Sequence, residues 1–186
     1  FGIRMAYGKA VKEYLLLLDS NPNKYQYISD RIMIFPDYQE VTNTISTILS
    51  ESKINSAQYI LADLKFKQKQ YDAAYKLLQK YNASPTMLLD YAKSLSFIRE
   101  FVKAEQVLTN LISTKTDEKI ITQAIFEIAK IFESKMMAKS SNLPLSDFYN
   151  QNLFFSSPYI PIKEEAGIAL ENAIGIYDSL RVSKKN

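Results

Sequence analysis

Carboxylates, lysines and tyrosines are the side chains that could carry chemistry in this chain. The sequence contains no His and no Cys, which removes the commonest general base, the commonest metal ligand and any thiol nucleophile. Two pairs of carboxylates remain, Asp117 with Glu118 and Glu164 with Glu165. Both pairs stand at the start of a predicted helix, where negative charge complements the helix dipole. We therefore expect no catalytic residue, no metal site and no cofactor, and the chain is predicted not to be an enzyme.

Five lysines form a basic cluster in a predicted hairpin at residues 65–80: Lys65, Lys67, Lys69, Lys76 and Lys80. A solvated helix surface is the favoured interpretation, because the net charge of the whole chain is only +3 and no RNA-binding aromatic motif accompanies the lysines. The alternative is that this Lys-rich hairpin binds nucleic acid or another anionic surface. Nucleic acid is not the partner that we expect.

Aromatic residues gather between the last two predicted helices, in an irregular connector at residues 139–162. This connector is longer than the links of about 2–8 residues that are usual between helices of a bundle. One hypothesis is that its aromatic side chains bind a partner protein, because such residues carry much of the energy of interfaces. The other is that they cap the open end of the helical array. The predicted partner-binding residues are Phe148, Tyr149, Phe154, Phe155 and Tyr159.

Tyrosine is frequent, with 13 copies, whereas the chain has no Trp. Most tyrosines fall on apolar helix stripes, where the ring packs and the hydroxyl reaches the surface. Four others are candidates for a polar role: Tyr25, Tyr27, Tyr75 and Tyr81.

A series of helices must position all of these residues, because apolar side chains recur with the helical period along most of the chain. Asp37 is predicted to cap the third helix in a capping box with Glu40, and Tyr38 is predicted to lie on the inner face of that helix. The last helix is predicted to bury Tyr177 and Leu180. The predicted ranges are 2–19, 24–34, a helix opened by Asp37 that runs to about 50, 55–69, 71–81, 85–98, 101–113, 117–138 and 163–181.

Two of the predicted hairpins, within residues 55–113, repeat each other with an offset of 30 residues. Small residues recur at the positions where two helices of a hairpin would cross, which lets the helix backbones approach closely. A large aromatic residue recurs at the start of each second helix. The matched pairs are Ala62 with Ala92, Ala74 with Ala104, Leu78 with Leu108, and Tyr71 with Phe101.

These matched residues resemble tetratricopeptide repeats, in which small residues at the helix crossing and a large residue opening the second helix hold each hairpin together. Three features depart from that family. The period is shorter than the usual value of about 34 residues, Gln58 and Leu88 replace an early aromatic residue, and Lys69 and Arg99 replace a Gly before the second helix. The resemblance implies stacked antiparallel helical hairpins, a tetratricopeptide-like α-solenoid. An irregular helical bundle is the alternative fold.

The predicted organisation is a single all-α domain over residues 1–186. It comprises N-terminal helices at 1–50, the repeat-like hairpins at 55–113, and a C-terminal helix pair at 117–181 with the connector 139–162 inserted. Helical arrays of this kind usually hold other proteins. We therefore expect a non-enzymatic protein–protein interaction module or assembly scaffold, whose partner is another protein.

The cellular location of the protein is predicted from two sequence features. The chain starts at Phe1 rather than Met and lacks Cys, which favours a processed protein of the bacterial periplasm or cell envelope over a cytoplasmic one. No apolar run is long enough to form a transmembrane helix.

Overall fold

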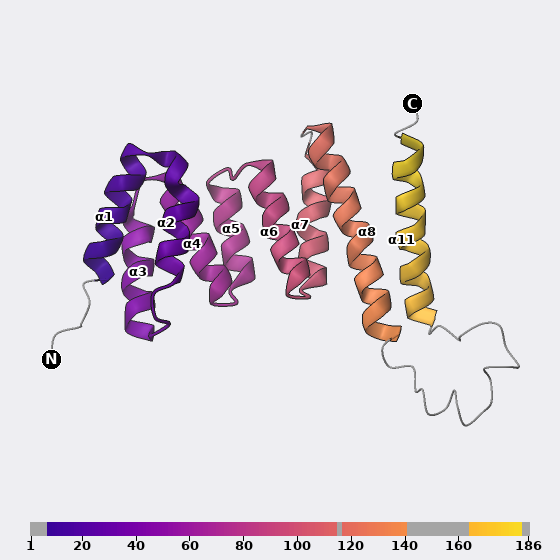
Figure 1. Cartoon of the computed structure of the whole chain (residues 1–186), viewed down its shortest axis with the longest axis horizontal. Helices are drawn as coiled ribbons and strands as arrows, with labels where there is room; N and C mark the ends of the chain where they lie inside the picture. The colour runs from indigo at the N-terminus through magenta and orange to yellow at the C-terminus, as the bar shows by residue number, and fades with distance from the viewer. Residues whose placement is uncertain (1–6, 115–116, 141–163, 184–186) are drawn as a thin grey trace, which may run out of the picture. The chain divides into compact units, whose positions relative to one another are not determined.

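The computed structural model describes residues 7–114, 117–140 and 164–183, and within these ranges the chain consists of helices joined by short turns, with no strand (Figure 1). The predicted all-α fold is confirmed, and helices that are neighbours in sequence pack in pairs. The helices are α1 (Tyr7–Ser20), the 3-10 helix η1 (Pro22–Lys24), α2 (Tyr25–Met33), α3 (Gln39–Glu51), α4 (Asn55–Lys67), α5 (Tyr71–Lys80), α6 (Pro85–Phe97), α7 (Phe101–Ser113), α8 (Glu118–Ser140) and α11 (Glu164–Ser183).

The chain divides into two compact units, Phe1–Ala83 and Ser84–Asn186. The first unit contains α1 to α5, and the second contains α6, α7, α8 and α11. The division falls between the two repeat-like hairpins, so that α4 and α5 belong to one unit and α6 and α7 to the other.

In the first unit, the hydrophobic core is built from the inner faces of α1, α2, α3 and α4. A polar residue, Gln58, is also buried there, with an exposed fraction of 2%. Its amide nitrogen donates hydrogen bonds to the carbonyl oxygens of Leu49, at 2.9 Å, and Ser52, at 2.8 Å. Gln58 thus satisfies carbonyl groups at the C-terminal end of α3, which explains why an amide is accommodated at this core position.

The start of α3 differs from the prediction. The N-cap residue is Tyr38, whose side chain makes no capping hydrogen bond, so the predicted capping box of Asp37 and Glu40 is wrong. Asp37 lies one residue too early, and its carboxylate pairs instead with the Lys67 ammonium at 3.2 Å. Tyr38 is 70% exposed rather than on the inner face.

The two repeat-like hairpins have closely matched backbones. The helices α4 and α6 have 13 residues each and begin at Asn55 and Pro85, and α5 and α7 begin at Tyr71 and Phe101, so each pair of starts is 30 positions apart. The four alanines that the sequence assigned to the helix crossings are buried: Ala62, Ala74, Ala92 and Ala104.

The turns inside the two hairpins are also alike. Lys69 and Arg99 both have a left-handed backbone, with φ of 61° and 66°. The amide of Lys69 donates to the Phe66 carbonyl and that of Gln70 to the Lys65 carbonyl, both at 2.9 Å. The corresponding bonds, from Arg99 to Ser96 and from Glu100 to Leu95, recur 30 residues later. This is the Schellman pattern of a helix end, for which Gly is the usual left-handed residue.

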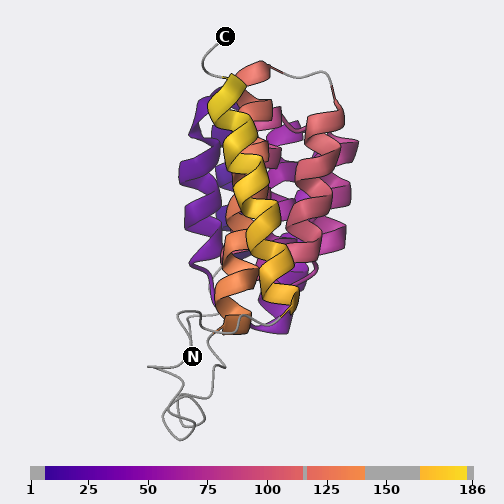
Figure 2. The ribbon, with the colours of Figure 1, turned by 90° about the vertical axis from the view of Figure 1, so that its right-hand side faces the viewer.

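In the second unit, α7 packs on α8, and α8 packs on α11. The long helices α8 and α11 lie side by side (Figures 1 and 2), with Ala124 and Ala129 of α8 and Ala169 and Ala173 of α11 buried. The carboxylate of Asp117 accepts a hydrogen bond from the Lys119 amide at 3.1 Å, at the start of α8. Helix α8 continues to Ser140, so residues 139–140 are helical and not part of an irregular connector as predicted.

The described part of the chain lacks two features, a membrane-spanning helix and a metal-binding cluster. None of its helices combines the length and apolar character that crossing a bilayer requires. Nor do its carboxylates gather in a group that could hold a metal ion.

Candidate functional site: an apolar groove in the second unit

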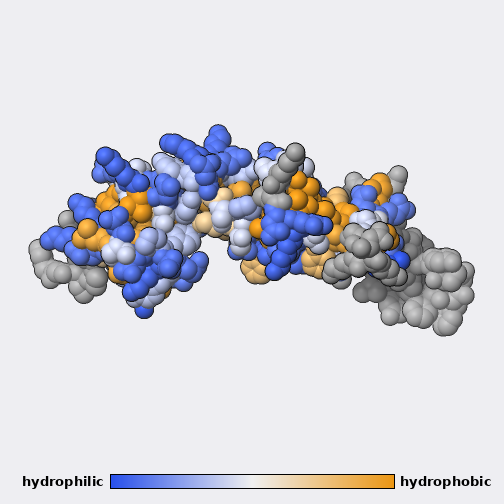
Figure 3. Space-filling model, turned by 90° about the horizontal axis from the view of Figure 1, so that it is seen from above, coloured by the Kyte–Doolittle hydropathy of each residue, from blue (hydrophilic) through white to orange (hydrophobic). Residues whose placement is uncertain are grey.

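The predicted partner-binding residues Phe148, Tyr149, Phe154, Phe155 and Tyr159 lie outside the described residues. The candidate site must therefore be built from the remaining side chains. Exposed hydrophobic residues occur in both units, and the face in Figure 3 shows them as separate patches among hydrophilic residues.

One of these hydrophobic regions is hollowed. A groove of about 670 Å³ runs between α6, α8 and α11 of the second unit. Its apolar floor is formed by Phe126, Tyr177 and Leu180, and the rings of Phe126 and Tyr177 pack with their centroids 5.7 Å apart. Phe126 is 46% exposed, so that a large part of its ring faces the groove. The remaining lining residues are polar or charged: Lys93, Thr122, Gln123, Glu127 and Arg181.

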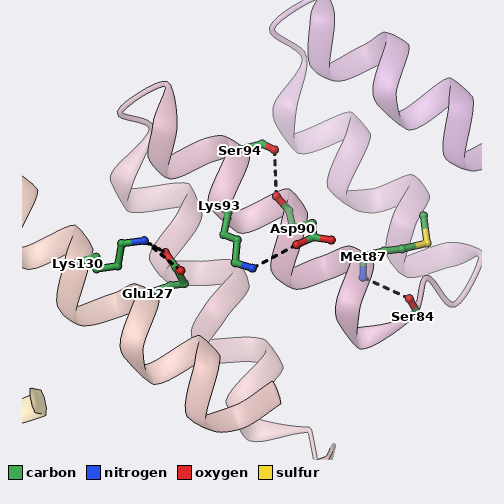
Figure 4. Close-up of polar contacts among 7 residues, drawn as sticks. All are labelled: Ser84, Met87, Asp90, Lys93, Ser94, Glu127 and Lys130. Atoms are coloured by element: carbon green, nitrogen blue, oxygen red, sulfur yellow. Dashed lines mark hydrogen bonds and ion pairs between the residues drawn. The ribbon is translucent and has the colours of Figure 1, made fainter. Parts of the chain in front are cut away.

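The charged residues around the groove are paired along their own helices (Figure 4). Lys93 contacts Asp90 at 3.3 Å, and Lys130 contacts Glu127 at 3.0 Å. Arg181 contacts Asp178 at 3.5 Å. Each pair is separated by three residues, one helical turn, so these charges balance locally and contribute little to stability. The rim therefore offers no uncompensated charge to a ligand.

Helix α6, which lines one side of the groove, has a capped N-terminus. The Ser84 hydroxyl accepts a hydrogen bond from the Met87 amide at 3.3 Å, and Pro85 occupies the first turn (Figure 4). A Ser N-cap followed by Pro is a favoured helix start. The Ser94 hydroxyl donates to the Asp90 carbonyl at 3.0 Å.

Tyr177 links the groove to the neighbouring helix. Its hydroxyl donates to the Glu133 carboxylate at 3.1 Å. Desolvation, with the hydrogen bond to Glu133, raises the pKa of the Tyr177 hydroxyl above its ordinary value. The hydroxyl is therefore a fixed donor rather than a base. Together with the apolar floor, this arrangement suits binding.

Part of this groove could be predicted from the sequence. Phe126 stands off the apolar stripe of its helix, which is a signal that could have identified it. Tyr177 and Leu180 were predicted to be buried, but they are half-buried and line the groove. The groove itself joins residues from 93 to 181, and no local pattern predicts that α6 and α11 flank the same stretch of α8.

A partly buried carboxylate in the first unit, Asp63, was not predicted. Asp63 of α4 accepts hydrogen bonds from the Tyr25 hydroxyl at 2.7 Å and the Ser29 hydroxyl at 2.6 Å, both on α2. Burial raises the pKa of the Asp63 carboxyl, although the two hydrogen bonds oppose the shift. Burial likewise raises the pKa of the Tyr25 hydroxyl. Both donors are engaged by one oxygen of Asp63, so the cluster ties α2 to α4. Of the four tyrosines singled out for a polar role, Tyr25 has one.

The Lys-rich hairpin is only partly available for binding. Lys67 donates to the Met33 carbonyl at 3.0 Å in addition to its pairing with Asp37, and Lys65 lies 3.4 Å from the Gln68 side-chain oxygen. Lys65 and Lys67 border a polar hollow together with residues of α3. Lys69, Lys76 and Lys80 are exposed.

No protein-family model matches this chain, and no characterised protein or solved structure matches it either. The resemblance of residues 55–113 to tetratricopeptide repeats stays a prediction. The function must therefore be inferred from the chemistry of the chain's own surface.

Proposed function

We propose that this protein is a non-enzymatic module that binds another protein in the groove between α6, α8 and α11. The observation that carries the proposal is the half-exposed Phe126, packed beside Tyr177 and Leu180 at the floor of an open groove. Burying these side chains against a partner removes apolar surface from water, which is the main favourable term in association.

The distribution of polar groups supports a protein partner. Protein interfaces combine an apolar centre, enriched in aromatic residues, with a polar and solvated rim. The groove has this arrangement, with its apolar floor framed by Lys93, Glu127 and Arg181. Because those charges are already paired, a partner needs to supply apolar side chains rather than a particular charge. An amphipathic helix, laying its apolar face between α8 and α11, meets this requirement.

Site-specific photocrosslinking tests the proposal. A photoreactive Phe analogue at position 126 should give a discrete protein adduct in an extract of the source cells, and Leu180→Glu should abolish that adduct by placing a charge in the groove floor. The matched control carries the analogue at Tyr38, which is 70% exposed in the first unit. The proposal fails if position 126 gives no adduct or gives the same adducts as position 38.

The alternative function, binding of nucleic acid or another anionic surface by the Lys-rich hairpin, is favoured by the exposure of Lys69, Lys76 and Lys80. It requires an affinity that falls steeply with salt. Charge reversal of Lys69 and Lys76 should then abolish binding, while reversal of the paired Lys93 should not. Equal affinity of all these variants for a nucleic acid would exclude this function.

The wider role that we propose is assembly scaffolding in a bacterial periplasm or cell envelope. This setting rests on the sequence features alone, whereas the groove rests on the packing of the second unit.

A further inference from the structure

The turn between α6 and α7 exposes hydrophobic side chains to an unusual degree. Phe97 is 89% exposed, Val102 is 76% exposed and Ile98 is 39% exposed. These residues stand within residues 97–102, which we call the apolar turn. A single exposed hydrophobic residue needs no explanation, but three large ones on six consecutive residues form a patch.

Folding does not require these residues to be apolar. The turn between α4 and α5, residues 67–72, has the same left-handed residue and the same backbone hydrogen bonds. At the positions of Phe97, Ile98 and Val102 it carries Lys67, Gln68 and Asp72. The same backbone is therefore compatible with polar side chains. The hydrophobic residues of the apolar turn need a reason other than the stability of the turn.

We propose that the apolar turn inserts into the interfacial layer of a lipid bilayer. Its side chains lie in the tight turn of a hairpin, where Phe97 and Val102 are mostly exposed to solvent. A specific protein interface needs about 800 Å² from each partner, which three side chains cannot supply. Reversible insertion into a bilayer needs no complementary shape, and each apolar group that enters contributes separately.

The charges of the apolar turn fit this occupant. Arg99 is exposed at the left-handed position between Ile98 and Glu100. An Arg side chain can place its aliphatic stem among apolar groups while its guanidinium stays at the level of lipid phosphates. The adjacent Glu100 balances the charge of Arg99. Membrane binding by this turn should therefore depend on apolar insertion and change little with salt, unlike binding by the Lys-rich hairpin.

The absence of Trp from the sequence allows a direct test. Phe97→Trp and Lys67→Trp each introduce a single Trp, at equivalent positions of the two turns. With phosphatidylcholine vesicles that carry brominated acyl chains, the emission of Phe97→Trp should shift to the blue and be quenched. The emission of Lys67→Trp should not change. The same behaviour of both variants, whether a shift in both or in neither, would overturn the proposal.

A second variant separates insertion from a change in folding. The triple substitution Phe97→Lys, Ile98→Gln and Val102→Asp gives the apolar turn the residues of its polar counterpart, which that backbone already accommodates. Co-sedimentation with the same vesicles should fall by about tenfold or more, the order expected when large apolar side chains no longer enter the bilayer, while the helical circular dichroism stays unchanged. Undiminished co-sedimentation would contradict the proposal. So would a blue shift of Phe97→Trp that appears without vesicles and grows with protein concentration, because the occupant would then be a second copy of the chain.

Discussion

The two hairpin turns, at residues 67–72 and 97–102, have the same backbone conformation but differ in the polarity of their exposed side chains. Both have a left-handed basic residue and the same pair of hydrogen bonds, yet one turn is polar and the other exposes Phe97 and Val102. The side chains that recur in the two hairpins lie at the helix crossings, whereas those that differ give each turn its own exposed surface.

The largest losses of stability are expected from substitutions in the hairpin cores. They test whether the two hairpins are packed equally well. Leu78 and Leu108 are matched core positions, 4% and 0% exposed. We expect Leu78→Ala and Leu108→Ala each to lower the free energy of unfolding by about 2–5 kcal/mol, because each removes buried methyl groups and leaves a cavity. Urea denaturation, followed by circular dichroism, measures both. A loss near zero at either position would mean that the two cores are not equivalent.

A smaller loss of stability is expected from substitutions in the first helices of the two hairpins, and it should differ between the two. Gln58 and Leu88 occupy equivalent positions, but only Gln58 is buried with two hydrogen bonds to carbonyl groups. Gln58→Ala should lower the free energy of unfolding by about 1–3 kcal/mol, since two hydrogen bonds to carbonyl groups are lost.

The matched control is Leu88→Ala, at a partly exposed position, which should cost less than Gln58→Ala. Equal losses in urea denaturation would show that the hydrogen bonds of Gln58 contribute nothing beyond side-chain packing.

A gain in stability should be common to both turns. Left-handed backbone is strained for residues with a Cβ atom, so Lys69→Gly and Arg99→Gly should each raise the free energy of unfolding by about 0.5–1 kcal/mol. Lys69→Ala and Arg99→Ala keep the Cβ atom and should give no gain. Thermal unfolding measures all four variants, and a gain in only one turn would show that the two backbones are strained to different degrees.

The last comparison concerns how stability changes with pH, and it sets a partly buried carboxylate of the first unit against an exposed one. Burial raises the pKa of the Asp63 carboxyl in the folded state, so the folded state favours the protonated form. The stability contributed by this group is present below the ordinary carboxyl pKa and is lost as the pH rises through the raised value. Asp63→Asn should remove this loss, and its stability relative to the parent protein should increase with pH across that range.

Asn at position 63 can still accept hydrogen bonds from Tyr25 and Ser29, so the substitution tests charge rather than packing. Denaturation at a series of pH values provides the measurement. Asp19→Asn is the control, since Asp19 is an exposed carboxylate of α1 and lies outside the cluster. A constant difference between Asp63→Asn and the parent at every pH would contradict the assigned shift.

Local patterns were sufficient to predict the helices. The four helices of the two hairpins end within two residues of their predicted bounds, and the alanines at the crossings are buried as predicted. Such features depend on the helical period and on side-chain size, which a sequence displays directly.

The features that the sequence did not predict depend on partners distant in the chain. Asp37 lies one residue before the N-cap Tyr38, and its carboxylate pairs with Lys67 of α4. Asp63 is a partly buried acceptor because α2 places Tyr25 and Ser29 beside it. The groove required α6, α8 and α11 to come together. None of these pairings leaves a periodic pattern in the sequence.

The local pairing of charges around the groove has a kinetic consequence. Lys93, Arg181 and Glu127 each face an opposite charge one helical turn away, so the rim projects little net field to guide an approaching molecule. Encounters should then proceed without electrostatic steering, at about 10⁵–10⁶ M⁻¹s⁻¹. Partners would differ mainly in how long they stay bound, and the time for which an apolar side chain remains against Phe126 would set the lifetime of the complex.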